Sequence, residues 1–123
     1  MENNLIYYER EDQSGPKKSL VTLFPVTPGS SLKDMLLKSL GVLAVVDKAR
    51  GVYFVENVKI HLDDVKDLGQ FVEVEAIDRQ GNIGAEKLRR QCEGFLDRFG
   101  IRADQLVSCS YSDMIMNQSL ISR

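Results

Sequence analysis

The residues best suited to chemistry lie between positions 58 and 77, in the stretch VKIHLDDVKDLGQFVEVEAI. Glu73 and Glu75 stand two positions apart in it, and Asp63 lies ten residues before Glu73. Because side chains on a strand switch faces at every residue, Glu73 and Glu75 share one face at roughly 7 Å spacing. We expect Asp63 to join them across a hairpin. Three carboxylates on one face repel each other unless a cation or basic groups lie among them.

Basic residues on other predicted strands supply the complementary charge. Lys48 and Arg50 share a face of one strand, Arg10 and Lys59 lie on two others, and Lys17 lies near a strand start. Lys and Arg bind phosphate oxygens, and Arg does so bidentately. Clustered Asp and Glu hold a hard cation such as Mg²⁺ or Mn²⁺, which bridges phosphates. The combination predicts a metal-bound polyphosphate such as a nucleoside triphosphate.

A plainer interpretation fits the same pattern. Antiparallel sheets often leave one face in water, where cross-strand ion pairs are ordinary. The remaining candidates favour structural roles. We expect His61, the only histidine, to be a partly exposed strand residue rather than a metal ligand, and Cys92 to be a core residue. Cys109 has no evident activating base, and Tyr111 is expected to be a packing or hydrogen-bonding residue rather than a catalytic one.

The pattern of apolar residues predicts an α+β fold with one domain over residues 1–123. Strands rich in β-formers alternate with turn residues, and two stretches carry apolar residues at helical spacing. Ser31 and Gly41 suit the start and end of the first helix. The predicted strands are Leu5–Arg10, Ser19–Pro25, a region Val42–Val55 with a bend or bulge at Gly51, and the hairpin Val58–Ile77; the predicted helices follow Ser31, span Ala85–Phe99 and fall within Asp104–Met116.

Composition excludes several classes of function. The 123 residues carry a net charge of −2, so nothing favours nonspecific binding of nucleic acid or an anionic membrane. There is no apolar run of about 18 residues, so no membrane span is expected. The N-terminus lacks the pattern of a signal peptide, and two cysteines do not make a disulfide framework. A cytoplasmic protein is therefore expected.

Five short segments occur in an order typical of a known family. The run from His61 is fairly specific, and the others gain weight from their order. The segments are LIYYER (Leu5–Arg10), GPKKS (Gly15–Ser19), VDKAR followed by Tyr53 (Val46–Arg50), HLDDVKDLGQFVEVE (His61–Glu75) and SYSDM (Ser110–Met114). Together they resemble the CYTH family, also called triphosphate tunnel metalloenzymes, and in particular its class IV adenylyl cyclase branch and the related thiamine triphosphatases.

The resemblance implies an antiparallel barrel with charged side chains inside and helices outside. It also implies that a triphosphate such as ATP, thiamine triphosphate or tripolyphosphate is bound with Mg²⁺ or Mn²⁺ and is cyclised or cleaved. By position, Glu73 and Glu75 resemble metal ligands, and Asp63 a metal-associated or water-positioning catalytic carboxylate. The residues that resemble the family's phosphate-binding residues are Arg10, Lys17, Lys48 and Arg50. The resemblance also implies a catalytic role for Lys48.

The family's N-terminal ExExK strand has no counterpart in this sequence. The expectation is therefore a domain truncated at its N-terminus, with a partial, open barrel and exposed strand edges. A homodimer that pairs these edges would fill the gap. Two further interpretations remain beside the enzyme: a non-catalytic module that binds polyphosphate or nucleotide, and an oligomeric structural remnant of such an enzyme.

Overall fold

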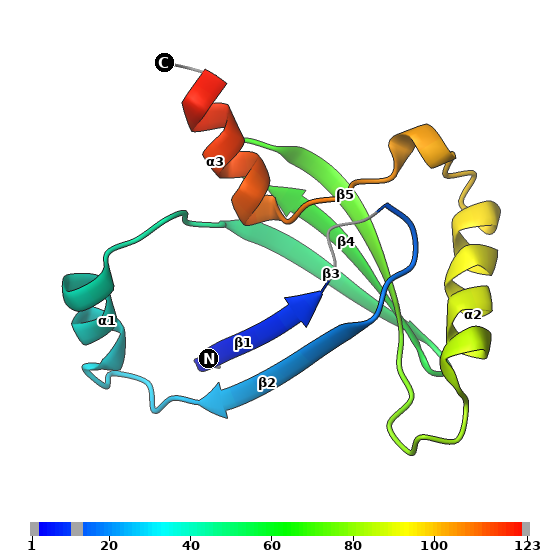
Figure 1. Ribbon diagram of the computed structural model, residues 1–123, viewed down its shortest axis with the longest axis horizontal. Helices are drawn as coiled ribbons and strands as arrows, with labels where there is room; N and C mark the ends of the chain where they lie inside the picture. Colours follow the sequence, from blue (N-terminus) through cyan, green and yellow to red (C-terminus); the bar gives the residue numbers. More distant parts are fainter. Residues whose placement is uncertain (1–2, 11–13, 122–123) are drawn as a thin grey trace.

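The computed structural model describes residues 3–10 and 14–121. In chain order the elements are β1 (Asn4–Arg10), β2 (Ser19–Pro25), α1 (Leu32–Leu40), β3 (Lys48–Val55), β4 (Val58–Val65), β5 (Gly69–Ala76), α2 (Ala85–Arg98), a short 3₁₀ turn (Ala103–Gln105) and α3 (Tyr111–Ile121). Within that part of the chain the strands form two antiparallel sheets that do not close into a barrel (Figure 1). The predicted α+β fold with an open arrangement of antiparallel strands is confirmed.

The larger sheet has the order β3-β4-β5, with β4 in the centre. Its pairing runs without interruption from Lys48↔Val65 to Val55↔Val58, so Gly51 makes no bulge. Because β4 has a neighbour on each side, its side chains are the most buried among the described residues. Val58, Ile60 and Val65 are the buried apolar residues of the described part of the chain.

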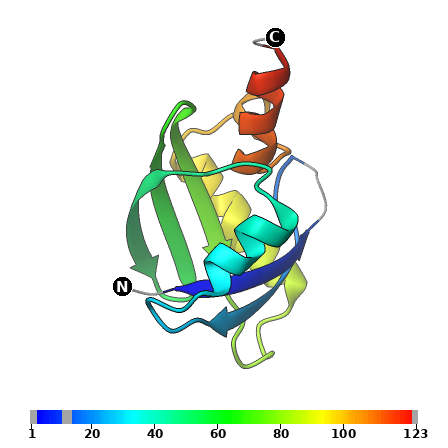
Figure 2. The same cartoon turned by 90° about the vertical axis from the view of Figure 1, so that its left-hand side faces the viewer.

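The smaller sheet is a hairpin of β1 and β2, paired from Asn4↔Pro25 to Arg10↔Ser19. Every residue of both strands is exposed. The hairpin and α1 lie apart from the larger sheet, with α1 at the far side of the molecule from α2 (Figures 1 and 2). Ser31 precedes α1 without a side-chain capping bond to the backbone, contrary to the prediction; its hydroxyl lies 3.9 Å from Met35 Sδ instead.

Helix α2 packs against β5 and closes one side of the larger sheet (Figure 1). Its predicted apolar stripe is half-buried over most of its length, and Cys92 Sγ donates to the carbonyl oxygen of Val74 at 3.9 Å. The β3–β4 turn is tied to α2 by two 2.9 Å hydrogen bonds between the side-chain amides of Asn57 and Gln91. These contacts fix the orientation of the sheet's other face, which carries the charged residues.

One predicted strand boundary is wrong. Residues 42–47 are loop, and β3 begins only at Lys48. Strand β3 cannot begin earlier because its partner, β4, ends at Val65, and Val65 already pairs with Lys48. Beyond that point the backbone N–H of Lys66 bonds to the carbonyl of Asp47, and the chain turns into β5. Apolar residues before Lys48 therefore have no strand beside them.

Candidate functional site

The charged residues of the larger sheet share one face because of its register. Paired residues of an antiparallel sheet point to the same side. Arg50 is paired with Asp63, and His61 with Glu73. Lys48 lies two residues before Arg50 on β3, so it joins them on what we call the charged face: Lys48, Arg50, Lys59, His61, Asp63, Glu73 and Glu75. Acidic and basic groups from three strands thus meet in one place.

Arg50 and Asp63 form the strongest contact on this face. Arg50 Nε donates to Asp63 Oδ1 at 2.6 Å, and Nη2 donates to Oδ2 at 2.7 Å. Nη2 also lies 3.4 Å from Glu73 Oε2. The Asp63 side chain is 0% exposed and that of Arg50 27%. The hydrogen bonds from Arg50 lower the pKa of Asp63 to about 2, helped by the hydroxyl of Tyr111, so Asp63 is a carboxylate at neutral pH.

Tyr111, the first residue of α3, reaches this face from the end of the chain. Its hydroxyl donates to Asp63 Oδ2 at 2.8 Å, and its ring packs on Phe71 with centroids 5.0 Å apart. Lys48 Nζ lies 5.3 Å from the centre of the same ring, within the range of a cation–π contact. Burial raises the pKa of Tyr111, as does its bond to Asp63. Burial also lowers the pKa of Lys48, and the Arg50 cation lowers it further.

His61 is buried, at 6% exposure, so the prediction of a partly exposed residue is wrong. His61 lies on β4, the central strand between β3 and β5. The alternation of apolar and polar residues in the sequence does not reveal whether a strand is central or at the edge of its sheet. His61 Nδ1 lies 3.2 Å from Glu73 Oε2. Its Nε2 is buried and has no hydrogen-bond partner among the described residues. His61 and Arg50 together hold one oxygen of Glu73.

The three predicted metal ligands, Asp63, Glu73 and Glu75, differ in exposure and in hydrogen bonding. Asp63 accepts hydrogen bonds on both oxygens, so its carboxylate holds Arg50 and Tyr111 in place. Glu75 is exposed and pairs in register with Lys59. Within residues 3–10 and 14–121, no three His, Cys, Asp or Glu side chains come close enough to form a metal site. Glu73 and Glu75 share the face, and they are the carboxylates there that Arg50 and Tyr111 do not saturate.

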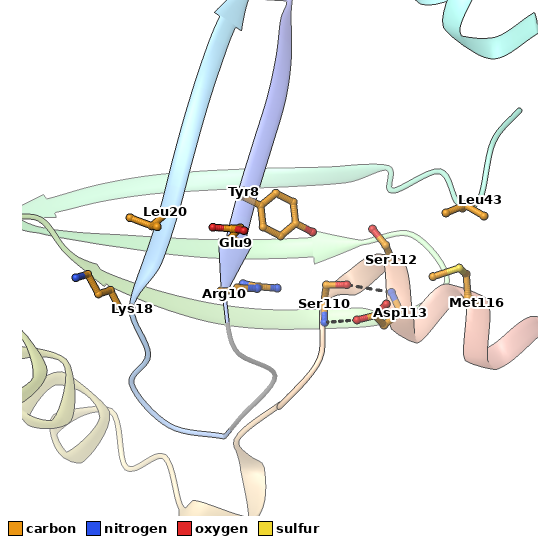
Figure 3. Close-up of a pocket in the computed structure, with 10 residues that line it drawn as sticks. All are labelled: Tyr8, Glu9, Arg10, Lys18, Leu20, Leu43, Ser110, Ser112, Asp113 and Met116. Carbon is orange, nitrogen blue, oxygen red and sulfur yellow. Dashed lines mark hydrogen bonds between the residues drawn. The ribbon is translucent and has the colours of Figure 1, made fainter. Parts of the chain in front are cut away.

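Arg10 and Lys17, the other predicted phosphate-binding residues, lie on the N-terminal hairpin. Arg10 stands over the ring of Tyr8, with 5.6 Å between its guanidinium carbon and the ring centre. The side chains of Arg10 and Tyr8 line an open hollow of about 870 Å³ between β1 and the start of α3, whereas Lys17 is not among its lining residues (Figure 3). Ser110 and Asp113 face this hollow and cap α3 through reciprocal side-chain bonds of 3.1 and 3.3 Å. Lys17 is half-buried in the β1–β2 loop.

The structure therefore brings together Lys48, Arg50, Asp63 and Glu73, and places Arg10 and Lys17 on another part of the chain. Tyr111 is confirmed as a packing and hydrogen-bonding residue. Its direct contact with Asp63, 48 residues away in sequence, could not be derived from local pattern. The His61–Glu73 contact could have been found, because the two residues are paired once the hairpin register is fixed.

Comparison with known proteins supports a family assignment. The family model described as CYTH domain matches residues 2–100. A solved structure, the PH1012 protein from Pyrococcus horikoshii OT3, is similar with a TM-score of 0.70 and 22% sequence identity; the match covers 89% of this chain and 66% of that one. At this identity the likeness establishes the fold. This chain thus spans just under two thirds of the solved protein's length. No curated protein gave a significant match.

Proposed function

The chain belongs to the CYTH domain family, a metal-dependent triphosphate-binding family, and from that premise we propose that its charged face binds a triphosphate small molecule. ATP, thiamine triphosphate and inorganic tripolyphosphate are the candidates. We also propose that residues 1–123 act as one domain. The contact between Tyr111, which lies beyond the matched residues, and Asp63 supports that extension.

The observation that carries the proposal is the state of Arg50. Two of its nitrogens are fixed by Asp63, whereas Nη1 meets no acceptor among the described residues. A guanidinium held this way has already lost much of its rotamer freedom, so less is lost when it binds a phosphate. Lys48 stands two residues away on the same face, and no carboxylate of the described chain lies within ion-pair distance of its Nζ. Two cations with open donors suit adjacent phosphate groups.

Glu73 and Glu75 fit a divalent cation that arrives with the ligand. Mg²⁺ is usually bound by one or two carboxylates together with substrate phosphate oxygens and water, so two carboxylates suffice. Such an ion would supply charge stabilisation to the phosphates. Asp63 would act as a positioning residue for Arg50. We propose Arg10 and Lys17 as further contacts for the end of a longer ligand.

Binding can be tested by calorimetry with tripolyphosphate, with and without Mg²⁺. Replacing Arg50 with Ala should weaken binding about 10- to 100-fold, the value of charge-assisted hydrogen bonds to one phosphate. The matched control is Arg89→Ala, because Arg89 pairs with Glu86 on the exposed surface of α2. Equal losses in the two variants, or no heat with the unaltered chain, would count against the proposal.

We propose cyclisation or hydrolysis of the triphosphate, as in the adenylyl cyclase and thiamine triphosphatase branches, as the reaction that this site would support. Lys48 and Arg50 would stabilise charge on the phosphates. A second candidate, binding without turnover, is favoured by one observation: the Asp63 side chain is 0% exposed and both of its oxygens already accept hydrogen bonds, so little acceptor capacity remains for a water or a cation. Assays for pyrophosphate and phosphate release with each ligand, Mg²⁺ and Mn²⁺ separate the two.

A further inference from the structure

The chain exposes far more surface than a compact protein of its size. Its accessible surface is 9788 Å². A compact monomer of 13.9 kDa exposes about 6,700 Å², so roughly 3,000 Å² is in excess. A stable protein–protein interface of standard size needs about 800 Å² from each partner. The excess is therefore large enough for an extensive interface.

The apolar part of this excess is concentrated on what we call the N-terminal surface: β1, β2, α1 and residues 41–47. The paired residues Ile6 and Leu23 lie on one face of the hairpin and are 53% and 58% exposed. The neighbouring pair, Leu5 and Phe24, lies on the opposite face at 47% and 63%. Leu40 on α1 is 80% exposed. A hairpin that is apolar on both faces, and that makes few contacts with the other described elements, is marginal in water.

The charges of this surface suit a second copy of the same chain. Its described elements carry three acidic residues, Glu9, Asp34 and Asp47, and three basic ones, Arg10, Lys33 and Lys38. A surface without net charge can meet an identical surface without long-range repulsion. In a two-fold dimer the same patch is used by both copies, which requires that self-compatibility. Obligate homodimer interfaces are also the large, apolar class.

We propose that the N-terminal surface is a homodimer interface, on which the same surface of a second copy docks around a two-fold axis. The interface buries the apolar residues of β1, β2 and α1 that the isolated chain exposes. It leaves the charged face of β3-β4-β5 outside the contact. Arg10 on β1 is also proposed as a contact for a longer ligand, but the interface uses neither Lys48 nor Arg50, so either proposal can fail without the other.

Sedimentation equilibrium of the unaltered chain tests the proposal. The expected result is a species of twice 13.9 kDa, with a melting temperature that rises with protein concentration because the dimer is the folded form. A monomer that melts cooperatively at a temperature independent of concentration would overturn the proposal. A ladder of larger aggregates without a defined dimer would overturn it as well.

A charge placed on the hairpin locates the interface. Phe24→Glu should raise the dimer dissociation constant at least about 30-fold, because an unpaired charge at a buried apolar contact costs several kcal/mol. Phe99→Glu is the control: Phe99 is 47% exposed at the end of α2, outside the N-terminal surface, and the variant should remain dimeric. A Phe24→Glu variant that still dimerises with unchanged affinity would contradict this interface. If that variant does not fold, the concentration dependence of the unaltered chain remains decisive.

Discussion

Arg50 is held by a carboxylate that is itself held by a tyrosine. Asp63 accepts from Arg50 on both oxygens and from the Tyr111 hydroxyl on one of them. Removing one partner of a buried pair leaves the other charge uncompensated, which costs more than the pair's own net stabilisation. Because Tyr111 holds Asp63 and Asp63 holds Arg50, we expect substitutions at Asp63 and Tyr111 to affect ligand binding through the position of Arg50.

Asp63→Asn should destabilise the fold in a pH-dependent way. The pKa of Asp63 is lowered from 3.8 to about 2, so the unfolded chain binds its proton more readily. This contribution, on the order of 2 kcal/mol, is complete above about pH 4 and is lost as the pH falls toward 2. The stability gap between the unaltered chain and Asp63→Asn, measured by urea unfolding at several pH values, should shrink below pH 4.

Asp64→Asn is the matched control for that experiment. Asp64 is the next residue of β4 and is exposed on the other face of the sheet. Its replacement should change stability by less than about 0.5 kcal/mol, the usual value at exposed positions. A difference in unfolding free energy between the unaltered chain and Asp63→Asn that stays constant from pH 7 to pH 2 would show that the charge of the Asp63 carboxylate does not stabilise the fold.

Tyr111→Phe removes one hydroxyl and keeps the ring that contacts Phe71 and Lys48. The lost bond to Asp63 should cost about 1–2 kcal/mol, since the carboxylate acceptor is charged. It should also weaken tripolyphosphate binding by less than Arg50→Ala does, because Asp63 still holds Arg50. Urea unfolding and calorimetry of the same variant give both values. A binding loss as large as that of Arg50→Ala would make Tyr111 a direct ligand contact.

Among the elements, β4 and α2 could be predicted best from sequence. The apolar stripe of α2 and the two strand faces of the hairpin are local periodicities that the structure retains. Burial on β4 does not follow its alternation, because His61 and Asp63 are buried and Leu62 is 46% exposed. The start of β3 and the burial of His61 could not be predicted, because each depends on which strand lies alongside. The same is true of Tyr111, whose helix meets the sheet only in the folded chain. Local pattern thus gives the strand faces, and pairing decides which side chains are buried.

The link between the β3–β4 turn and α2 makes a prediction at this scale. Asn57 exchanges two bonds with Gln91 and donates a third, of 3.2 Å, to the carbonyl of Ile77. Asn57→Ala leaves Gln91 and that carbonyl without partners and should cost about 1–3 kcal/mol. Unfolding of Asn57→Ala, Gln91→Ala and the double variant should give an interaction energy of about 1 kcal/mol. Additive losses would mean that the two amides do not depend on each other.

Across the whole molecule, the larger sheet with α2 and α3 contains the core and the charged face, and the N-terminal surface contains most of the exposed apolar residues. No helix in the described part of the chain is long and apolar enough to cross a bilayer. We therefore expect the larger sheet to be more stable than the N-terminal hairpin. Amides of β4 should exchange slowly with solvent at every protein concentration, because both neighbours pair with it.

Amides of β1 and β2 should exchange faster and should slow as protein concentration rises, because the dimer covers them. Hydrogen exchange followed by mass spectrometry, at concentrations below and above the dissociation constant, measures β4 and the hairpin together in each sample. Hairpin protection that is independent of concentration would contradict the assignment of the interface to β1 and β2.

The most direct test of the central claim follows the side-chain Nε–H signal of Arg50 by NMR during titration with tripolyphosphate. Phosphate at Nη1 alters the guanidinium that Asp63 holds, so the Arg50 signal should shift saturably with the affinity found by calorimetry. The Nε–H signal of Arg89, on the outer surface of α2, should not move. Saturable binding that leaves the Arg50 signal unchanged would contradict the claim that the charged face is the triphosphate site.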